Sequence, residues 1–213
     1  MAEDRRGAEL SLALPMRGVA VTFAVAVALL NAANAVAIGA LDELVYFRLD
    51  SEANPSTWFS SVLWLVAAAL LAGRAVRATA QRAGWWGATA FAAALSMDET
   101  ASMHERLSFL PGADLLPFGW VIPAGVIGAA VAAVLAPWFR SLDGRLQGGL
   151  AIALVTTVIG AVGIETVAGF YVEDHGRDRA YLVLATVEEN LELAGAALAI
   201  TTLARAGREP VSP

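Results

Sequence analysis

The chain alternates between long apolar runs and short polar stretches, a pattern that predicts six membrane-spanning helices. Each run is close to the ~20 residues that a helix needs to cross a bilayer. Lipid cannot satisfy exposed backbone groups, so these runs are expected to be helical. The resulting fold class is all-α, a six-transmembrane-helix bundle forming one domain over residues 1–213. The predicted segments are residues 18–41, 56–76, 85–107, 119–139, 148–172 and 180–204.

Composition agrees with a membrane protein and removes several kinds of site. The chain is 58% hydrophobic, whereas soluble domains are roughly 45–50% apolar. It contains no cysteine, which excludes disulfides and thiolate metal sites. Its net charge of −6 argues against a nucleic-acid partner, because nucleic-acid binding needs a basic face. The expected partner is the lipid bilayer.

Arginine placement predicts the orientation. All 14 basic residues are Arg. Most of them lie before the first segment, between segments 2 and 3, between segments 4 and 5, and after the last segment. Positive charge favours the cytoplasmic side, so both termini are predicted to be cytoplasmic. This placement requires an even number of spans. Asn54-Pro55-Ser56 reads as the start of the second segment, with Ser56 as its expected cap.

Two acidic stretches interrupt the apolar runs, at residues 94–107 and 186–195. With a rise of ~1.5 Å per residue, Asp98 lies roughly 20 Å and Glu165 roughly 25 Å from the cytoplasmic side of a ~30 Å core. Glu188 and Glu192 lie roughly 12 and 18 Å below the outer face. Three segments therefore place acids in the outer half of the membrane. Because ionisable groups at this depth are costly, they are candidates for a functional site.

Helical periodicity sorts these residues into faces. If segment 85–107 is one helix, Asp98 and Glu105 share a face, while Glu99 and His104 point elsewhere. Glu188 and Glu192 are four residues apart and share a face as well. Asn31 and Asn34, on the first segment, are expected to make an interhelical hydrogen bond more readily than to line a cavity. We therefore expect a polar pocket between segments 3, 5 and 6.

A divalent metal ion would neutralise several of these acids at once. Carboxylates with one imidazole suit Zn²⁺, Fe²⁺, Mn²⁺ or Mg²⁺. A metal-bound water would then be the nucleophile of a hydrolase, with Glu189 or Glu99 as general base. His104 could instead be a surface histidine or support a ligand, and His175 reads as a solvated loop residue. The expected metal ligands are Asp98, His104, Glu105, Glu165, Glu188 and Glu192.

Two other classes of function compete with a metal-dependent enzyme or metal-binding protein acting on a lipid-soluble or extracytoplasmic small molecule. Acids within membrane helices also mark proton or cation pathways. Against transport, the cytoplasmic halves of the segments carry few polar residues. The remaining class is structural or partner-binding, with acids that are protonated or paired with Arg. Known metal signatures do not decide the matter, because residue 108 is Ser where the zincin motif has His.

Three motifs together resemble a family of multispan bacterial membrane proteins that has no established activity. They are Ser96-Met-Asp98-Glu99-x4-His104-Glu105, Gly163-Ile-Glu165 and Glu188-Glu189-x2-Glu192. The likeness covers segments 3 to 6. It implies a bacterial inner-membrane protein that crosses the membrane several times.

Overall fold

The computed structural model describes residues 16–39, 42–51 and 53–206, and these ranges are helical without any strand. Residues 144–175 form one continuous helix of 32 residues in three consecutive parts, so the described ranges contain six long helices. The elements are α1 (Met16–Gly39), η1 (Asp42–Phe47), α2 (Pro55–Arg77), α3 (Arg82–Ala101), η2 (Glu105–Phe109), η3 (Ala113–Leu115), α4 (Val121–Arg140), α5 (Gly144–Val158), η4 (Ile159–Ile164), α6 (Glu165–His175) and α7 (Arg179–Ala206).

The long helices match the predicted segments in number and order, with one large difference in length. α3 ends at Ala101, six residues before the predicted end of its segment at residue 107. Ser102 has a left-handed backbone, with a φ of 45°, which terminates the helix. A smaller difference lies at the start of α2, where Asn54 is the cap in place of Ser56. The Asn54 side chain accepts a hydrogen bond from the backbone N–H of Thr57, and the Thr57 hydroxyl accepts one from the backbone N–H of Asn54.

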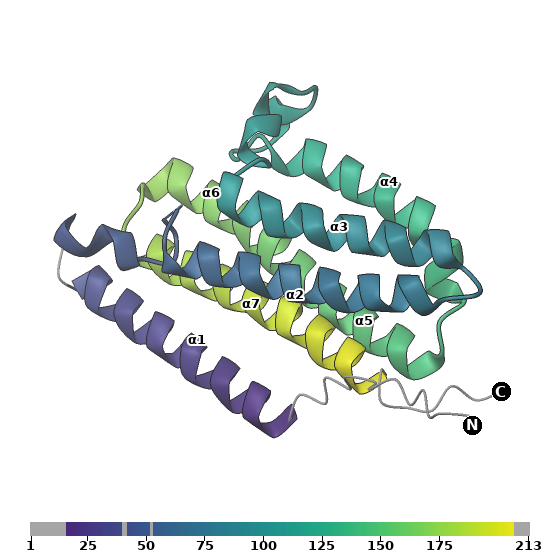
Figure 1. Cartoon of the computed structure of the whole chain (residues 1–213). Helices are drawn as coiled ribbons and strands as arrows, with labels where there is room; N and C mark the ends of the chain where they lie inside the picture. Colours follow the sequence, from purple (N-terminus) through teal and green to yellow (C-terminus); the bar gives the residue numbers. More distant parts are fainter. Residues whose placement is uncertain (1–15, 40–41, 52, 207–213) are drawn as a thin grey trace, which may run out of the picture.

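The helices form a bundle with two distinct ends (Figure 1). The α2–α3 and α4–α5 connections lie at the end where α7 finishes. The opposite end carries η1, η2, η3 and the α6–α7 connection, and we call it the η1 end. α7 is the most central helix, because it packs against α1, α2, α5, η4 and α6.

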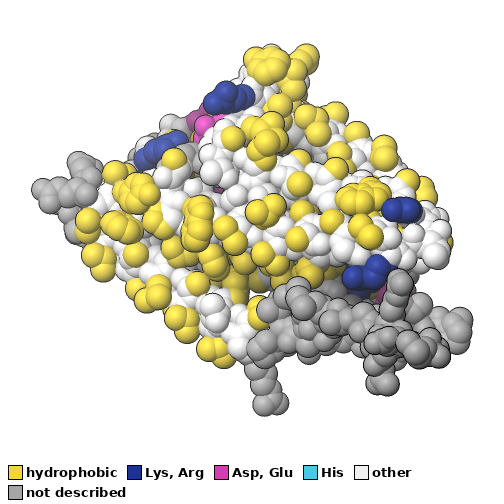
Figure 2. Space-filling model, viewed as in Figure 1, with side chains coloured by type: hydrophobic (Ala, Val, Ile, Leu, Met, Phe, Trp, Pro, Cys, Tyr) yellow, Lys and Arg dark blue, Asp and Glu magenta, His cyan; other side chains and the backbone are white. Residues whose placement is uncertain are grey.

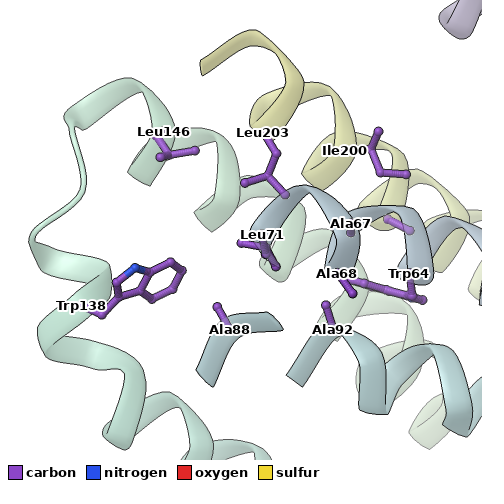
Figure 3. Packing of buried hydrophobic residues seen from close by; sticks show 11 residues of the cluster. Trp64, Ala67, Ala68, Leu71, Ala88, Ala92, Trp138, Leu146, Ile200 and Leu203 are labelled. Atoms are coloured by element: carbon purple, nitrogen blue, oxygen red, sulfur yellow. The ribbon is translucent and has the colours of Figure 1, made fainter. Parts of the chain in front are cut away.

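The main core fills the half of the bundle farther from η1. Small and large residues interdigitate there, such as Ala67 and Leu71 of α2 with Ala196, Ile200 and Leu203 of α7. Figure 3 shows these side chains together with Trp138 of α4 and Leu146 of α5. Alanine on facing helices lets the backbones approach closely, which fixes α7 against α2.

α1 is attached to α7 through polar side chains. Asn31 and Asn190 exchange two hydrogen bonds of 2.8 and 2.9 Å through their amide groups. Asn34 donates to the Thr186 hydroxyl at 2.9 Å and accepts from the backbone N–H of Leu49 at 3.0 Å. The predicted interhelical hydrogen bonds of Asn31 and Asn34 are therefore present.

Within the described part of the chain, four helical stretches are long and apolar enough to cross a membrane, namely residues 18–39, 55–77, 121–140 and 144–175. The other two long helices, α3 and α7, are the ones that carry the acidic motifs. Figure 2 shows hydrophobic side chains spread over the viewed face, with arginines at its margins. An apolar surface of this extent fits contact with lipid.

α7 begins with a side-chain cap at the η1 end. Asp178 accepts from the backbone N–H groups of Ala180 and Tyr181 at 2.9 and 3.1 Å. The Tyr171 hydroxyl also donates to Asp178, at 3.0 Å. The N–H of Tyr181, followed by these other donors, holds the pKa of the Asp178 carboxyl below its usual range. This cap ties the start of α7 to the end of α6.

Candidate functional site

Glu165 and Glu188 place their carboxyl groups together between α6 and α7. The side chains of Glu165 and Glu188 interact electrostatically across the interface between the two helices. Glu165 is the first residue of α6, and Glu188 lies near the middle of the η1-proximal half of α7. Two neighbouring carboxyl groups need a proton or a cation between them, because two bare carboxylates repel each other.

Glu192 extends this pair toward α3. It lies one helical turn after Glu188, and its strongest electrostatic partner is Glu99 of α3, followed by Glu189, Glu165 and Asp98. Side chains of α3, α6 and α7 thus interact electrostatically with one another. We call these six half-buried acidic residues the carboxylate cluster. Its members are Asp98, Glu99, Glu165, Glu188, Glu189 and Glu192.

A π-helical segment positions the α6 contribution. In η4 the backbone N–H of Glu165 donates to the carbonyl of Gly160, five residues earlier. Isolated π-turns of this kind are frequent at functional sites. Gly160 also allows α7 to approach closely, since a Cβ there would lie 3.0 Å from the Glu188 carbonyl oxygen and 3.1 Å from Glu192 Cγ. The backbone conformation of η4 and the close approach of α7 at Gly160 therefore set the position of Glu165 relative to α7.

Asp98 and His104 close the end of α3. One carboxylate oxygen of Asp98 accepts from the backbone N–H of His104 at 2.8 Å, and the other lies 2.8 Å from His104 Nδ1. The imidazole also packs on the Trp120 ring, with centroids 4.5 Å apart. Asp98 thereby joins the carboxylate cluster to the polar turn at the η1 end.

The predicted face shared by Asp98 and Glu105 is wrong. It required α3 to continue to residue 107, but the left-handed Ser102 ends the helix and Glu105 begins η2 instead. The Asp98 carboxylate stabilises this turn through its contacts with the backbone N–H and Nδ1 of His104. Its side chain therefore competes with continuation of the helix. The Glu105 side chain is exposed.

The nearby arginines have partners other than the carboxylate cluster. Arg48 makes a two-point contact with Asp50, with distances of 2.9 and 2.6 Å. The Arg177 guanidinium lies over the ring of Tyr181, 5.3 Å from its centroid. The strongest electrostatic partners of Glu188 and Glu192 are all acids. His175 is solvent-exposed, as predicted, but it is the last residue of α6 and not a loop residue, and it stacks on Tyr171 with ring centroids 4.4 Å apart.

Within the described ranges, no group of three or more His, Asp or Glu side chains has the arrangement of metal ligands. The carboxyl groups interact in pairs and at longer range. A metal ion held by three of them would require rotation of the long Glu side chains, which have several accessible rotamers.

The fold and the site define an all-helical membrane protein with an internal carboxylate cluster. More particularly, the chain belongs to a family described as a domain of unknown function (DUF8692), whose model matches residues 18–206. No curated protein and no solved structure matches the chain.

Proposed function

We propose that this protein is a multi-pass inner-membrane protein that binds a divalent cation at the carboxylate cluster. The observation that carries the proposal is the electrostatic interaction of acids from three helices: Glu188 interacts with Glu165 of α6, and Glu192 interacts with Glu99 of α3. Neighbouring acids of this kind repel one another when ionised, unless positive charge lies between them. A divalent ion supplies that charge to several carboxylates at once.

The membrane setting strengthens the need for a counter-ion. Burying one uncompensated carboxylate costs several kcal/mol, and Glu165, Glu188 and Glu192 interact with other acids in the cluster. Arg48 and Arg177 have other partners at the η1 end. If protons alone neutralised these acids, the cluster would carry no charge. A bound cation would instead keep the carboxylates ionised, as its ligands.

In the proposed topology six helices cross the membrane and both termini are cytoplasmic. The end of the bundle opposite to η1 carries Arg74, Arg77 and Arg82 around the α2–α3 connection, which is what a cytoplasmic face requires. The η1 end then faces the extracytoplasmic side. The carboxylate cluster lies in that half of the bilayer, within reach of water or of a lipid-soluble molecule.

Glu165, Glu188 and Glu192 are the proposed first ligands. Asp98 is held by His104, so this pair orients the α3 side of the site, and His104 remains the candidate nitrogen ligand. Oxygen-rich sites of this kind take Mg²⁺, Mn²⁺, Fe²⁺ or Zn²⁺. A bound ion would activate water for attack on a lipid-soluble or extracytoplasmic substrate.

In such a reaction the general base would be a carboxylate next to the ion that does not ligate it. Glu99 and Glu189 are the candidates, because both interact with Glu192. A general base takes a proton from the attacking water and commonly contributes 10²–10⁴-fold.

A second candidate function is proton binding coupled to movement of a cation. It is favoured by the same interaction between Glu165 and Glu188, because two neighbouring acids can share one proton. Tyr181, at the η1 end, interacts with Glu165, Glu188 and Asp50. These residues would connect the cluster to that surface.

Metal content distinguishes the candidates. The protein is purified in detergent without chelator, reloaded with Mn²⁺, Fe²⁺, Zn²⁺ or Mg²⁺, and analysed by inductively coupled plasma mass spectrometry. We expect about one ion per chain, lost in the double variant Glu188→Gln, Glu192→Gln. Glu173→Gln, at an exposed acid of α6, is the matched control and should retain the ion. Equal metal content in the double variant and the control would refute the metal site.

A further inference from the structure

Two serine hydroxyls of α2 are buried without a hydrogen-bond partner among the described residues. They are Ser56 Oγ and Ser60 Oγ, and their residues are only 2% and 1% exposed. Hydroxyls in helices usually donate to the carbonyl four residues earlier. Thr89, Thr100 and Thr186 do so here. A buried hydroxyl left unpaired costs roughly 1–3 kcal/mol, so we expect the Ser60 hydroxyl to bind a group that lies outside the described residues.

The packing of α2 on α7 shows where Ser60 points. Near its end, Arg74 of α2 donates to the Leu203 carbonyl of α7 at 3.4 Å. Both helices start at the η1 end, α2 at Pro55 and α7 at Arg179 (Figure 1). The two helices therefore run parallel, so facing residues keep a nearly constant sequence offset, which is 129 between Arg74 and Leu203.

This constant offset places Ser60 beside Glu189. The residues 60, 67, 71 and 74 share one face of α2, and 189, 196, 200 and 203 share one face of α7 with the same spacing. The last three members of each set meet in the main core or in the Arg74–Leu203 bond. Two helical turns toward the η1 end, the next pair is Ser60 and Glu189. Ser60 thus faces the carboxylate cluster from α2.

We propose that Ser60 Oγ is a further ligand of the cation at the carboxylate cluster, from a fourth helix. This inference rests on the proposed function. With Ser60 included, the cation ligands from α2, α6 and α7 are all oxygen atoms: one neutral hydroxyl from α2 and carboxylates from α6 and α7. Such a set selects a hard divalent cation of the Mg²⁺ or Mn²⁺ type over softer ions.

The neighbouring Ser61 provides an internal control. Its hydroxyl donates to the Ser96 carbonyl at 2.7 Å and accepts from Thr100 at 3.0 Å, so it belongs to the α2–α3 interface. Ser60 and Ser61 are adjacent and chemically identical, but they face different helices. Removing one hydroxyl or the other separates a ligand effect from a general effect on α2.

The test uses the full-length protein in detergent and Mn²⁺ as the probe, with binding followed by electron paramagnetic resonance. Ser60→Ala is expected to weaken Mn²⁺ binding by about 10-fold, the lower end of what loss of a supporting metal contact costs. Ser61→Ala should change it by less than about twofold. Ser60→Cys introduces a soft donor into a chain without cysteine, so it should shift the preference from Mn²⁺ toward Cd²⁺.

The outcomes separate the two proposals. If wild type binds no Mn²⁺ or other divalent ion, the proposed function fails first. If wild type binds Mn²⁺ but Ser60→Ala binds it equally well and Ser60→Cys gains no Cd²⁺ affinity, the Ser60 proposal alone is overturned. A folded Ser60→Cys that gains Cd²⁺ affinity supports it, because a merely structural serine would not alter ion preference.

Discussion

Replacing Gly195 with alanine is expected to force α7 away from α5 and weaken the fold. A Cβ at Gly195 would lie 2.0 Å from Thr157 Oγ1 and 3.0 Å from both the Ala153 carbonyl oxygen and the Thr157 nitrogen. The hydroxyl can rotate, but the two backbone atoms cannot move without shifting α5. Because Gly195 follows Glu192 by three residues, the shift would also reach the carboxylate cluster.

The magnitude follows from two opposing effects. Overpacking of a tight interface costs about 1–3 kcal/mol, and backbone contacts place this position at the upper end. Alanine is favoured over glycine in a helix by about 1 kcal/mol. The expected net loss is therefore about 1–2 kcal/mol in the free energy of unfolding, together with weaker metal binding.

The assay is equilibrium unfolding in mixed micelles with increasing sodium dodecyl sulfate, followed by circular dichroism. Gly128→Ala is the matched control, since a Cβ at this α4 glycine meets nothing within 4 Å. Adding Thr157→Ala to Gly195→Ala should recover part of the loss, whereas Thr157→Ser, which keeps the hydroxyl, should not. Unfolding of Gly195→Ala at the same detergent fraction as Gly128→Ala would refute the close approach.

Three further outcomes follow from the contacts described above. Asn31→Ala and Asn190→Ala should show a coupling of about 0.6–1.7 kcal/mol in a double-mutant cycle of micelle unfolding, the range for interhelical hydrogen bonds in membranes; additive effects would contradict their pairing. Gly160→Ala should lower both thermal stability and metal affinity, because its Cβ would lie 3.0 Å from the Glu188 carbonyl oxygen and 3.1 Å from Glu192 Cγ; an unchanged affinity in calorimetry would contradict this. Asp178→Ala should lower the thermal unfolding temperature at pH 7. The depressed pKa of Asp178, caused first by the N–H of Tyr181, means that its stabilising effect is present above about pH 4 and is lost as the pH falls through the folded-state value. Wild type and variant should therefore converge in acid, and a constant difference would contradict the cap.

The helices could be predicted because they follow from periodicity, and the meeting of acids stays a prediction that rests on the same periodicity. Apolar runs give the number and order of the helices, and the spacing of Glu188 and Glu192 places them on one face. Depth along the helices then brings Glu165 to the same level. None of these steps needs knowledge of how side chains pack.

The end of α3 and the proposed role of Ser60 in α2 could not be predicted from periodicity. The end depends on Asp98 binding two nitrogens of a residue six positions later, a contact that competes with the helix only when folded. Ser60 looks like any small residue of a packed membrane helix. Its one signal, a serine four residues before it at Ser56, is common wherever helices approach closely.

The single π-turn before Glu165 has a further consequence for the chain. One extra residue in a turn rotates everything after it by about 100° relative to an uninterrupted α-helix. If the same residues of η4 changed to ordinary α-helical hydrogen bonding, Glu165 would turn by about 100° away from the face that it now presents to α7, while the apolar character of the span stayed the same. Deleting one residue between Ile159 and Ile164 would instead remove the π-helical segment and leave Glu165 on its present face. A homologue shorter by one residue at this point can therefore keep the same acid facing α7 without any π-turn.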